Sequence, residues 1–162
     1  MTQDRQTWSQ RFEKALHPMI ARFNASISFD IELIEHDING SVAHTKMLAK
    51  TGIISAEEGE KLLTGLEQIR QEYRTGNFHI VEDAEDVHFA VEKRLIEITG
   101  DVGKKLHTAR SRNDQVGTDT RLYLREKIEQ IRFLLIKFQK VILELAESNI
   151  ETLIPGYTHL QR

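Results

Sequence analysis

The chain has 162 residues, 40% of them apolar and 29% charged, which is ordinary for one globular domain with a hydrophobic core. Its formal charge of −3 argues against a general nucleic-acid-binding protein, because that function needs a net basic face. It lacks cysteine, a signal-peptide-like start and any apolar run near the ~20 residues of a membrane span, so we expect a cytoplasmic protein without nucleic-acid or membrane partners.

Residues 1–25 lack clear periodicity, and we expect an extended arm that aromatic side chains fix to a neighbouring surface. These side chains are Trp8, Phe12 and Phe23. A helix is then predicted from Ile27 to Lys50, because isoleucines recur at spacings of 4, 3 and 4 and Gly52 supplies a stop. Ser26 lies at the start of this helix. Serine is a preferred N-cap residue, so helix capping is one interpretation of Ser26.

Two further helices are predicted in the first 100 residues. Ser55 and Glu58 form a capping box at the start of an amphipathic helix that Gly76 ends. A third apolar pattern runs from Val87 to Gly100. It begins beside an acidic cluster, whose charges would suit the first turn of a helix. The cluster consists of Glu82, Asp83, Glu85 and Asp86.

The longest element is predicted from Asn113 to Asn149, a segment without proline. Its apolar residues follow a heptad spacing and comprise Leu124, Ile128, Ile131, Leu135, Phe138, Ile142 and Leu145. As one helix it would be roughly 55 Å long at about 1.5 Å per residue, and would project beyond a domain with a radius of gyration of ~13–16 Å. Its apolar face would then be covered by helices from outside this chain. A coiled-coil dimer also fits the spacing.

A polar segment, HTARSRNDQVGTDT at residues 107–120, opens this long helix. Four cations lie within nine residues, namely Lys104, Lys105, Arg110 and Arg112, so the charge pattern favours a small acidic ligand over a polymer. Arginines, an amide and hydroxyl groups at a helix N-terminus are groups that bind carboxylates. A solvated loop with a helix cap is the alternative interpretation of these residue types.

The polar segment resembles the Ser-Arg-Asn-Asp-Gln block of the argininosuccinate lyase family, in the aspartase/fumarase superfamily. Three other stretches resemble the same family in the same order, namely FNASISFD at residues 23–30, EDVH at 85–88 and PGYTHLQR at 155–162. The resemblance covers essentially the whole chain. It implies an all-α fold, with a small N-terminal helical domain at residues 1–110. Residues 111–162 would begin the central long-helix bundle.

The family reversibly cleaves argininosuccinate into arginine and fumarate by β-elimination, in active sites assembled from several subunits of a homotetramer. The resemblance implies five substrate-binding residues, Ser26, Ser111, Arg112, Asn113 and Thr158. His159 matches the catalytic histidine, an acid–base group, and His88 is a secondary candidate in the EDxH block. The resemblance implies no cofactor and no metal. Asp86 and His88 would be a poor metal pair in any case, because residues two apart do not share a helix face.

The chain departs from the family at one loop, Gly-Ser-Ser-x-Met-Pro-x-Lys, whose serine is the other acid–base residue. No serine here precedes Met-Pro. We therefore expect this chain to hold part of a site and to be inactive in isolation, and its exposed heptad face to promote self-association. Two alternatives stay open: a non-catalytic helical protein of the same ancestry, like the delta crystallins, and another fumarate-releasing lyase of the superfamily.

Overall fold

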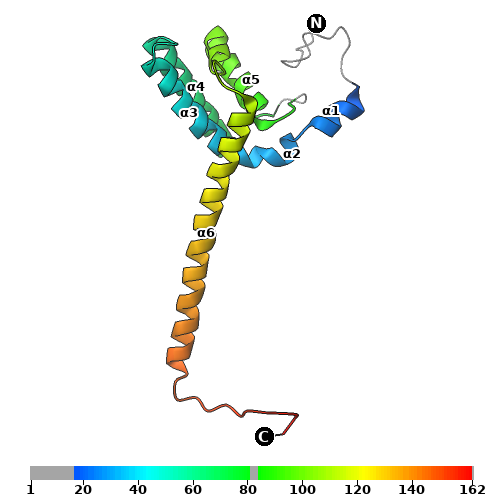
Figure 1. Ribbon diagram of the computed structural model, residues 1–162, viewed down its shortest axis with the longest axis vertical. Helices are drawn as coiled ribbons and strands as arrows, with labels where there is room; N and C mark the ends of the chain where they lie inside the picture. Colours follow the sequence, from blue (N-terminus) through cyan, green and yellow to red (C-terminus); the bar gives the residue numbers. More distant parts are fainter. Residues whose placement is uncertain (1–16, 81–83, 162) are drawn as a thin grey trace. The chain divides into compact units, whose positions relative to one another are not determined.

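The computed structural model describes residues 17–80 and 84–161. All regular elements in these residues are helical, which confirms the expected all-α fold (Figure 1). Two compact units, residues 1–123 and 124–162, are each described by themselves below. The domain boundary expected after residue 110, and the projection of the long helix beyond its domain, stay predictions.

Three helices, α3 (Ile34–Lys50), α4 (Ala56–Arg74) and α5 (Val87–Thr99), pack against one another and form the core of the first unit. The fully buried apolar side chains of this core include Ile34, Ile38, Leu48, Leu62, Leu66, Ile69, Val87 and Leu95. Gly65 lets α4 approach α5 closely, because a Cβ atom there would lie 2.7 Å from Leu95 Cδ1 and 2.8 Å from Thr99 Cγ2. The 3-10 helix η3 (Gly100–Lys105) contacts α4 and α5.

The ends of the core helices follow the sequence signals. Ser55 and Glu58 form the predicted capping box of α4, and Gly76 ends that helix with a φ of 74°. Gly100 follows α5 with a φ of 69°. The acidic cluster acts differently from the prediction, since the first turn of α5 contains no acid. Asp86 instead caps the helix by accepting the Phe89 N–H at 2.6 Å, whereas Glu82 and Asp83 lie outside the described residues.

The helix predicted from Ile27 to Lys50 is interrupted. Its residues form α2 (Ile27–Asp30), the 3-10 turn η2 (Ile31–Leu33) and then α3, and Gly52 follows with a φ of 73°. Before it, α1 (Pro18–Asn24) replaces the last part of the expected extended arm. Phe23, in α1, is 88% exposed among the described residues, so its expected contact with a neighbouring surface stays a prediction. Trp8 and Phe12 lie outside the described residues.

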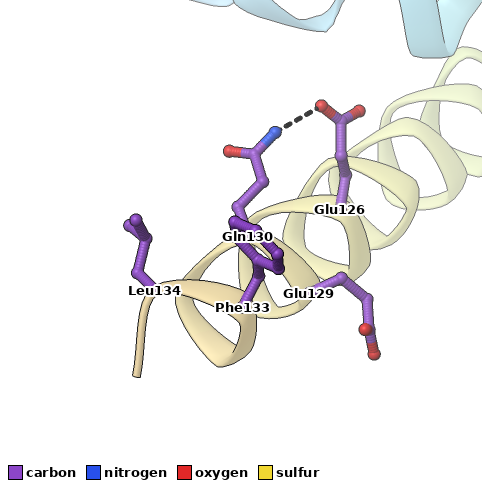
Figure 2. Close-up of a pocket in the computed structure, with 5 residues that line it drawn as sticks. All are labelled: Glu126, Glu129, Gln130, Phe133 and Leu134. Atoms are coloured by element: carbon purple, nitrogen blue, oxygen red, sulfur yellow. Dashed lines mark hydrogen bonds between the residues drawn. The ribbon is translucent and has the colours of Figure 1, made fainter. Parts of the chain in front are cut away.

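The helix α6 (Arg112–Ser148) confirms the predicted long helix and has 37 residues. Its first residues, to Tyr123, belong to the first unit, and the rest form most of the second unit. The heptad residues from Leu124 to Leu145 are 49–67% exposed. Figure 2 shows a surface pocket on this part of α6, lined by Glu126, Glu129, Gln130, Phe133 and Leu134. All five come from one helix, and Gln130 Nε2 donates to Glu126 Oε1 at 2.8 Å, so the pocket is a groove between neighbouring side chains.

Candidate functional site

The segment at Ser26 is fastened to the start of α5 by main-chain hydrogen bonds. The N–H groups of Ser26 and Ile27 both donate to the Glu85 carbonyl oxygen, at 2.8 and 3.2 Å. The Ser26 hydroxyl does not cap α2, so the capping interpretation is wrong. It donates instead to Asp30 Oδ2 at 2.5 Å, and Asp30 Oδ1 accepts the Val87 N–H at 3.1 Å. Ser26 is thereby placed beside the first turn of α5.

Arg112 brings the start of α6 to the same turn. Its Nε lies 3.8 Å from Asp86 Oδ2 and its Nη2 lies 3.3 Å from Glu92 Oε2, both from the α5 region. Nη1 donates to Gln115 Oε1 at 2.7 Å. Because acidic and amide oxygens already surround this guanidinium, Arg112 holds the helix start in place as well as contributing charge.

Ser111 and Asn113 lie on either side of Arg112 and are both exposed. The Ser111 hydroxyl accepts the Asn113 N–H at 3.3 Å, so the capping interpretation applies to Ser111. The Asn113 side chain lies in the first turn of α6, where helix N–H groups favour negative charge. The structure therefore gathers Ser26, Ser111, Arg112 and Asn113 near the N-terminal ends of α5 and α6.

A buried polar cluster lies behind this surface. Asp37 from α3, His88 from α5 and Asp119 from α6 are each no more than 1% exposed. His88 Nδ1 lies 2.9 Å from Asp37 Oδ1 and 3.5 Å from Asp119 Oδ2. Gln115 Nε2 also donates to Asp37 Oδ1. Three helices are thus joined through one imidazole ring and two carboxyl groups.

The electrostatics of the cluster separate its two carboxyl groups. Burial raises the pKa of Asp37, but the hydrogen bond and charge of His88, with Gln115 and Arg110, more than offset it and hold this pKa below its usual value. Burial, followed by the charge of Asp37, raises the pKa of Asp119 to about 7. Burial lowers the pKa of His88, yet the hydrogen bond and charge of Asp37 outweigh it, so this pKa is raised. The cluster thus favours ionised Asp37, charged His88 and neutral Asp119.

The same three residues are the group within residues 17–80 and 84–161 whose geometry could hold a metal ion, with ligand atoms within 4.8 Å of one another. Asp37 Oδ1 already accepts from both His88 and Gln115, so this oxygen is engaged in hydrogen bonds. The Asp86–His88 pair considered from the sequence is not a metal pair, since Asp86 caps α5 and His88 turns to Asp37. The cluster is organised by hydrogen bonds.

Thr158 and His159 belong to the second unit and are exposed. Thr158 and Gln161 exchange two backbone hydrogen bonds, at 2.9 and 3.0 Å, and the residues between them have positive φ angles of 51° at His159 and 64° at Leu160. Two residues with positive φ angles between two residues that exchange backbone hydrogen bonds form a tight turn. The His159 side chain is therefore presented at the tip of a closed turn.

The sequence interpretation missed Asp37 and Asp119, and it gave Gln115 no role. A signal was present, because Asp37, Ser41 and Thr45 continue the helical spacing of the buried isoleucines of α3. All three are fully buried. Asp37, a polar residue at an apolar position of α3, therefore indicated in the sequence that a buried polar cluster was present.

Comparison with known proteins assigns this chain to a family. A family model described as lyase matches residues 10–162. This chain belongs to the lyase family. The argininosuccinate lyase of Nostoc punctiforme is 77% identical over 157 residues, which are 97% of this chain and 34% of that protein. Those of Trichormus variabilis and a Synechocystis species are 74% and 73% identical over 98% of this chain and 34% of each protein.

The resemblance found in the four sequence motifs is thus confirmed, and this lyase chain spans about a third of the length of the curated relatives it matches. Among the described residues of the lyase chain, no helix combines the length and apolar content needed to cross a bilayer.

Proposed function

We propose that this lyase chain is part of an argininosuccinate lyase, which cleaves argininosuccinate reversibly into arginine and fumarate by β-elimination. The observation that carries the proposal is 77% identity over 97% of the chain to a protein of that name. Seven further relatives, 69–74% identical to this chain, carry the same name, and this disfavours both the non-catalytic and the other fumarate-releasing alternatives.

The reaction needs a base that removes a carbon-bound proton and an acid that protonates the departing guanidino nitrogen. The charge that develops on the succinyl part between these steps is stabilised by fixed donors. Exposed Asn113 and Ser111 at the start of α6 supply an amide and a hydroxyl group suited to the carboxylates. Ser26, beside α5, would contact substrate by turning its hydroxyl from Asp30 to the ligand. Thr158 would also contact substrate, and His159 would act as the acid–base group. Arg112 adds positive charge beside Asn113.

We propose a homotetramer as the working form, in a cytoplasmic setting. The exposed apolar residues of α6 support assembly, because a face of this kind is normally covered by other helices. Each active site would then combine residues from several copies of the chain.

The test is a chimera in which this chain replaces the matching segment of the Nostoc punctiforme protein. We expect the chimera to release fumarate and arginine from argininosuccinate, measured by product chromatography. Asn113→Ala should lower kcat/KM roughly 100-fold or more, as loss of a donor to developing charge does. Asn77→Ala, at an exposed asparagine after α4, is the matched control and should leave kcat/KM unchanged.

Two results would contradict the proposal: a folded chimera that releases fumarate only from another fumaryl substrate, or one that binds argininosuccinate without cleaving it. The 162-residue chain alone should show no cleavage, because the family's loop serine is absent from it.

A further inference from the structure

The Asp37–His88–Asp119 cluster contains more acceptors than donors. Asp37 Oδ1 accepts from His88 and Gln115, but Asp37 Oδ2 and both carboxyl oxygens of Asp119 have no hydrogen-bond partner among the described residues. These three atoms are fully buried, and an unpaired buried polar atom costs about 1–3 kcal/mol. A single proton shared by the two carboxyl groups would give partners to two of the three oxygens.

The charges around the cluster also require a proton there. The carboxyl groups are neighbours, since one oxygen of each lies within 3.5 Å of the same His88 nitrogen. Two adjacent buried carboxylates do not both ionise without matching cations. The cations that face them are His88 from α5 and Arg110 from the loop before α6.

Arg110 is only partly available to Asp119. Its Nη1 donates to Ser41 Oγ at 3.0 Å. A Cβ atom on Gly40 would lie 3.1 Å from Asp119 Oδ1 and 3.2 Å from Arg110 Nη2, so these two groups border the same space beside α3. Near His88, Asp86 adds negative charge that raises the pKa of the imidazole, and Arg112 adds positive charge with a smaller, opposite effect.

We propose that Asp119 is a positioning residue for His88: its carboxyl group donates a hydrogen bond to Asp37 Oδ2 and so commits Asp37 Oδ1 to His88 Nδ1. With Nδ1 fixed inward, Nε2 is the ring nitrogen available to other groups. The proposal deepens and rests on the function proposed above, because His88 affects the reaction only if substrate lies near the first turn of α5. Asp119 itself does not touch substrate.

Loss of the proton from Asp119 would undo this arrangement. A second carboxylate 3.5 Å from His88 Nδ1 would compete with Asp37 for the ring and repel Asp37. The ring would then leave its fixed orientation. Activity is therefore expected to fall as the pH rises through the ionisation of Asp119, in the range where the pKa of about 7 places it.

The experiment compares Asp119→Asn and Asp119→Ala in the chimera. Asparagine keeps an N–H donor for Asp37 and cannot ionise, so Asp119→Asn should retain kcat within about threefold and lose the decline above pH ~7. Alanine removes the donor, and kcat should fall roughly 10- to 100-fold with little change in KM, as expected for a displaced catalytic-site group. Equal losses in both variants, or an unchanged decline at high pH in Asp119→Asn, would overturn the proposal.

Infrared spectroscopy supplies a measurement that does not depend on activity. Below pH ~7 the chimera should show a carbonyl stretch from a protonated carboxyl group that is absent from Asp119→Asn. Asp101→Asn, at an exposed carboxylate paired with Lys104, is the control and should leave the band in place. A carbonyl band that Asp119→Asn leaves unchanged would contradict the positioning role of Asp119 even if the chimera is active. A chimera that lacks activity but shows this band would contradict the proposed function and leave the protonation of Asp119 supported.

Discussion

Two stretches of helix with the same apolar spacing have opposite surroundings. Apolar residues at steps of 4 and 3 occur as Leu62, Leu66 and Ile69 in α4, and as Leu124, Ile128 and Ile131 in α6. The first three are 0% exposed, whereas the second three are 51–60% exposed. Spacing therefore determines that a helix forms and which side is apolar. Burial depends on α3 and α5, which cover α4 and which the spacing within α4 does not specify.

The two histidines of interest differ in the same way. His88 is 1% exposed, and the packing of three helices determines its hydrogen-bond partners. His159 is exposed and its position depends on one four-residue turn.

The largest expected effect tests the contrast between the two helices directly. Leu66→Ala should lower the free energy of unfolding of the chain by about 3 kcal/mol, because it leaves a cavity among buried side chains. Leu124→Ala, the matched change at a 51% exposed leucine, should cost less than about 0.5 kcal/mol. Urea unfolding followed by circular dichroism measures both. Similar losses in the two variants would mean that the apolar face of α6 is covered in solution.

The next effect concerns close helix packing. Gly65→Ala should destabilise the first unit by about 2 kcal/mol, since the new methyl group meets Leu95 and Thr99 at under 3 Å. At Gly117→Ala, in α6, the new methyl group meets Arg121 Nη1 at 3.7 Å, an ordinary contact, so the change should stabilise by about 0.5–1 kcal/mol. Thermal unfolding measures whether each variant is more or less stable than the wild type. Two shifts of the same sign would contradict the packing described for α4 and α5.

A smaller effect depends on pH. The pKa of Asp119 is raised to about 7, whereas an aspartate in an unfolded chain titrates near 4. The folded state binds more protons between these values, so the unfolding free energy falls as the pH rises from about 4 to about 7. Asp119→Asn removes this dependence and should gain on the order of 1–2 kcal/mol relative to wild type across that range. Parallel curves of stability against pH for wild type and Asp119→Asn would refute the assigned pH dependence of Asp119. Asp101→Asn serves as the control.

The smallest effect concerns the backbone beside the polar segment. Ala109 has a φ of 55°, a left-handed conformation that strains a residue with a Cβ atom. Ala109→Gly should stabilise by about 0.5 kcal/mol, since relief of strain exceeds the added entropy of the unfolded chain. Ala43→Gly, in the middle of α3, should instead destabilise by about 1 kcal/mol. A destabilised Ala109→Gly variant would show that the left-handed conformation carries no strain.

Local signals predicted most of the helices correctly. The capping box at Ser55, the glycine stops and the heptad spacing all act within a few residues of chain, so the sequence contains the whole cause. The contact expected for Phe23 stays a prediction, because burial of an aromatic side chain requires a surface that the spacing of nearby residues does not specify. The interruption at Ile31 was missed because its isoleucines keep a helical spacing through the 3-10 turn.

The candidate site was predictable only in part. Motif resemblance singled out Ser26, Asn113 and His88 as candidates, and their roles stay predictions. The partners of His88 lie 51 and 31 positions away in the sequence. Which buried polar residue faces which ring depends on how α3, α5 and α6 pack, and packing is a property of the folded unit. The sequence indicated that Asp37 was out of place on an apolar face, without naming its partner.

The two hydrogen bonds from Ser26 and Ile27 to the Glu85 carbonyl have a kinetic consequence. Both use main-chain atoms only, so neither involves the Ser26 hydroxyl. Exchange of the Ser26 amide hydrogen with deuterium therefore reports how often the segment separates from α5, independently of the chemistry of the serine hydroxyl. A small dicarboxylate that bridges Ser26 and the start of α6 would slow this exchange, and the slowing would reveal occupancy of the site without any turnover.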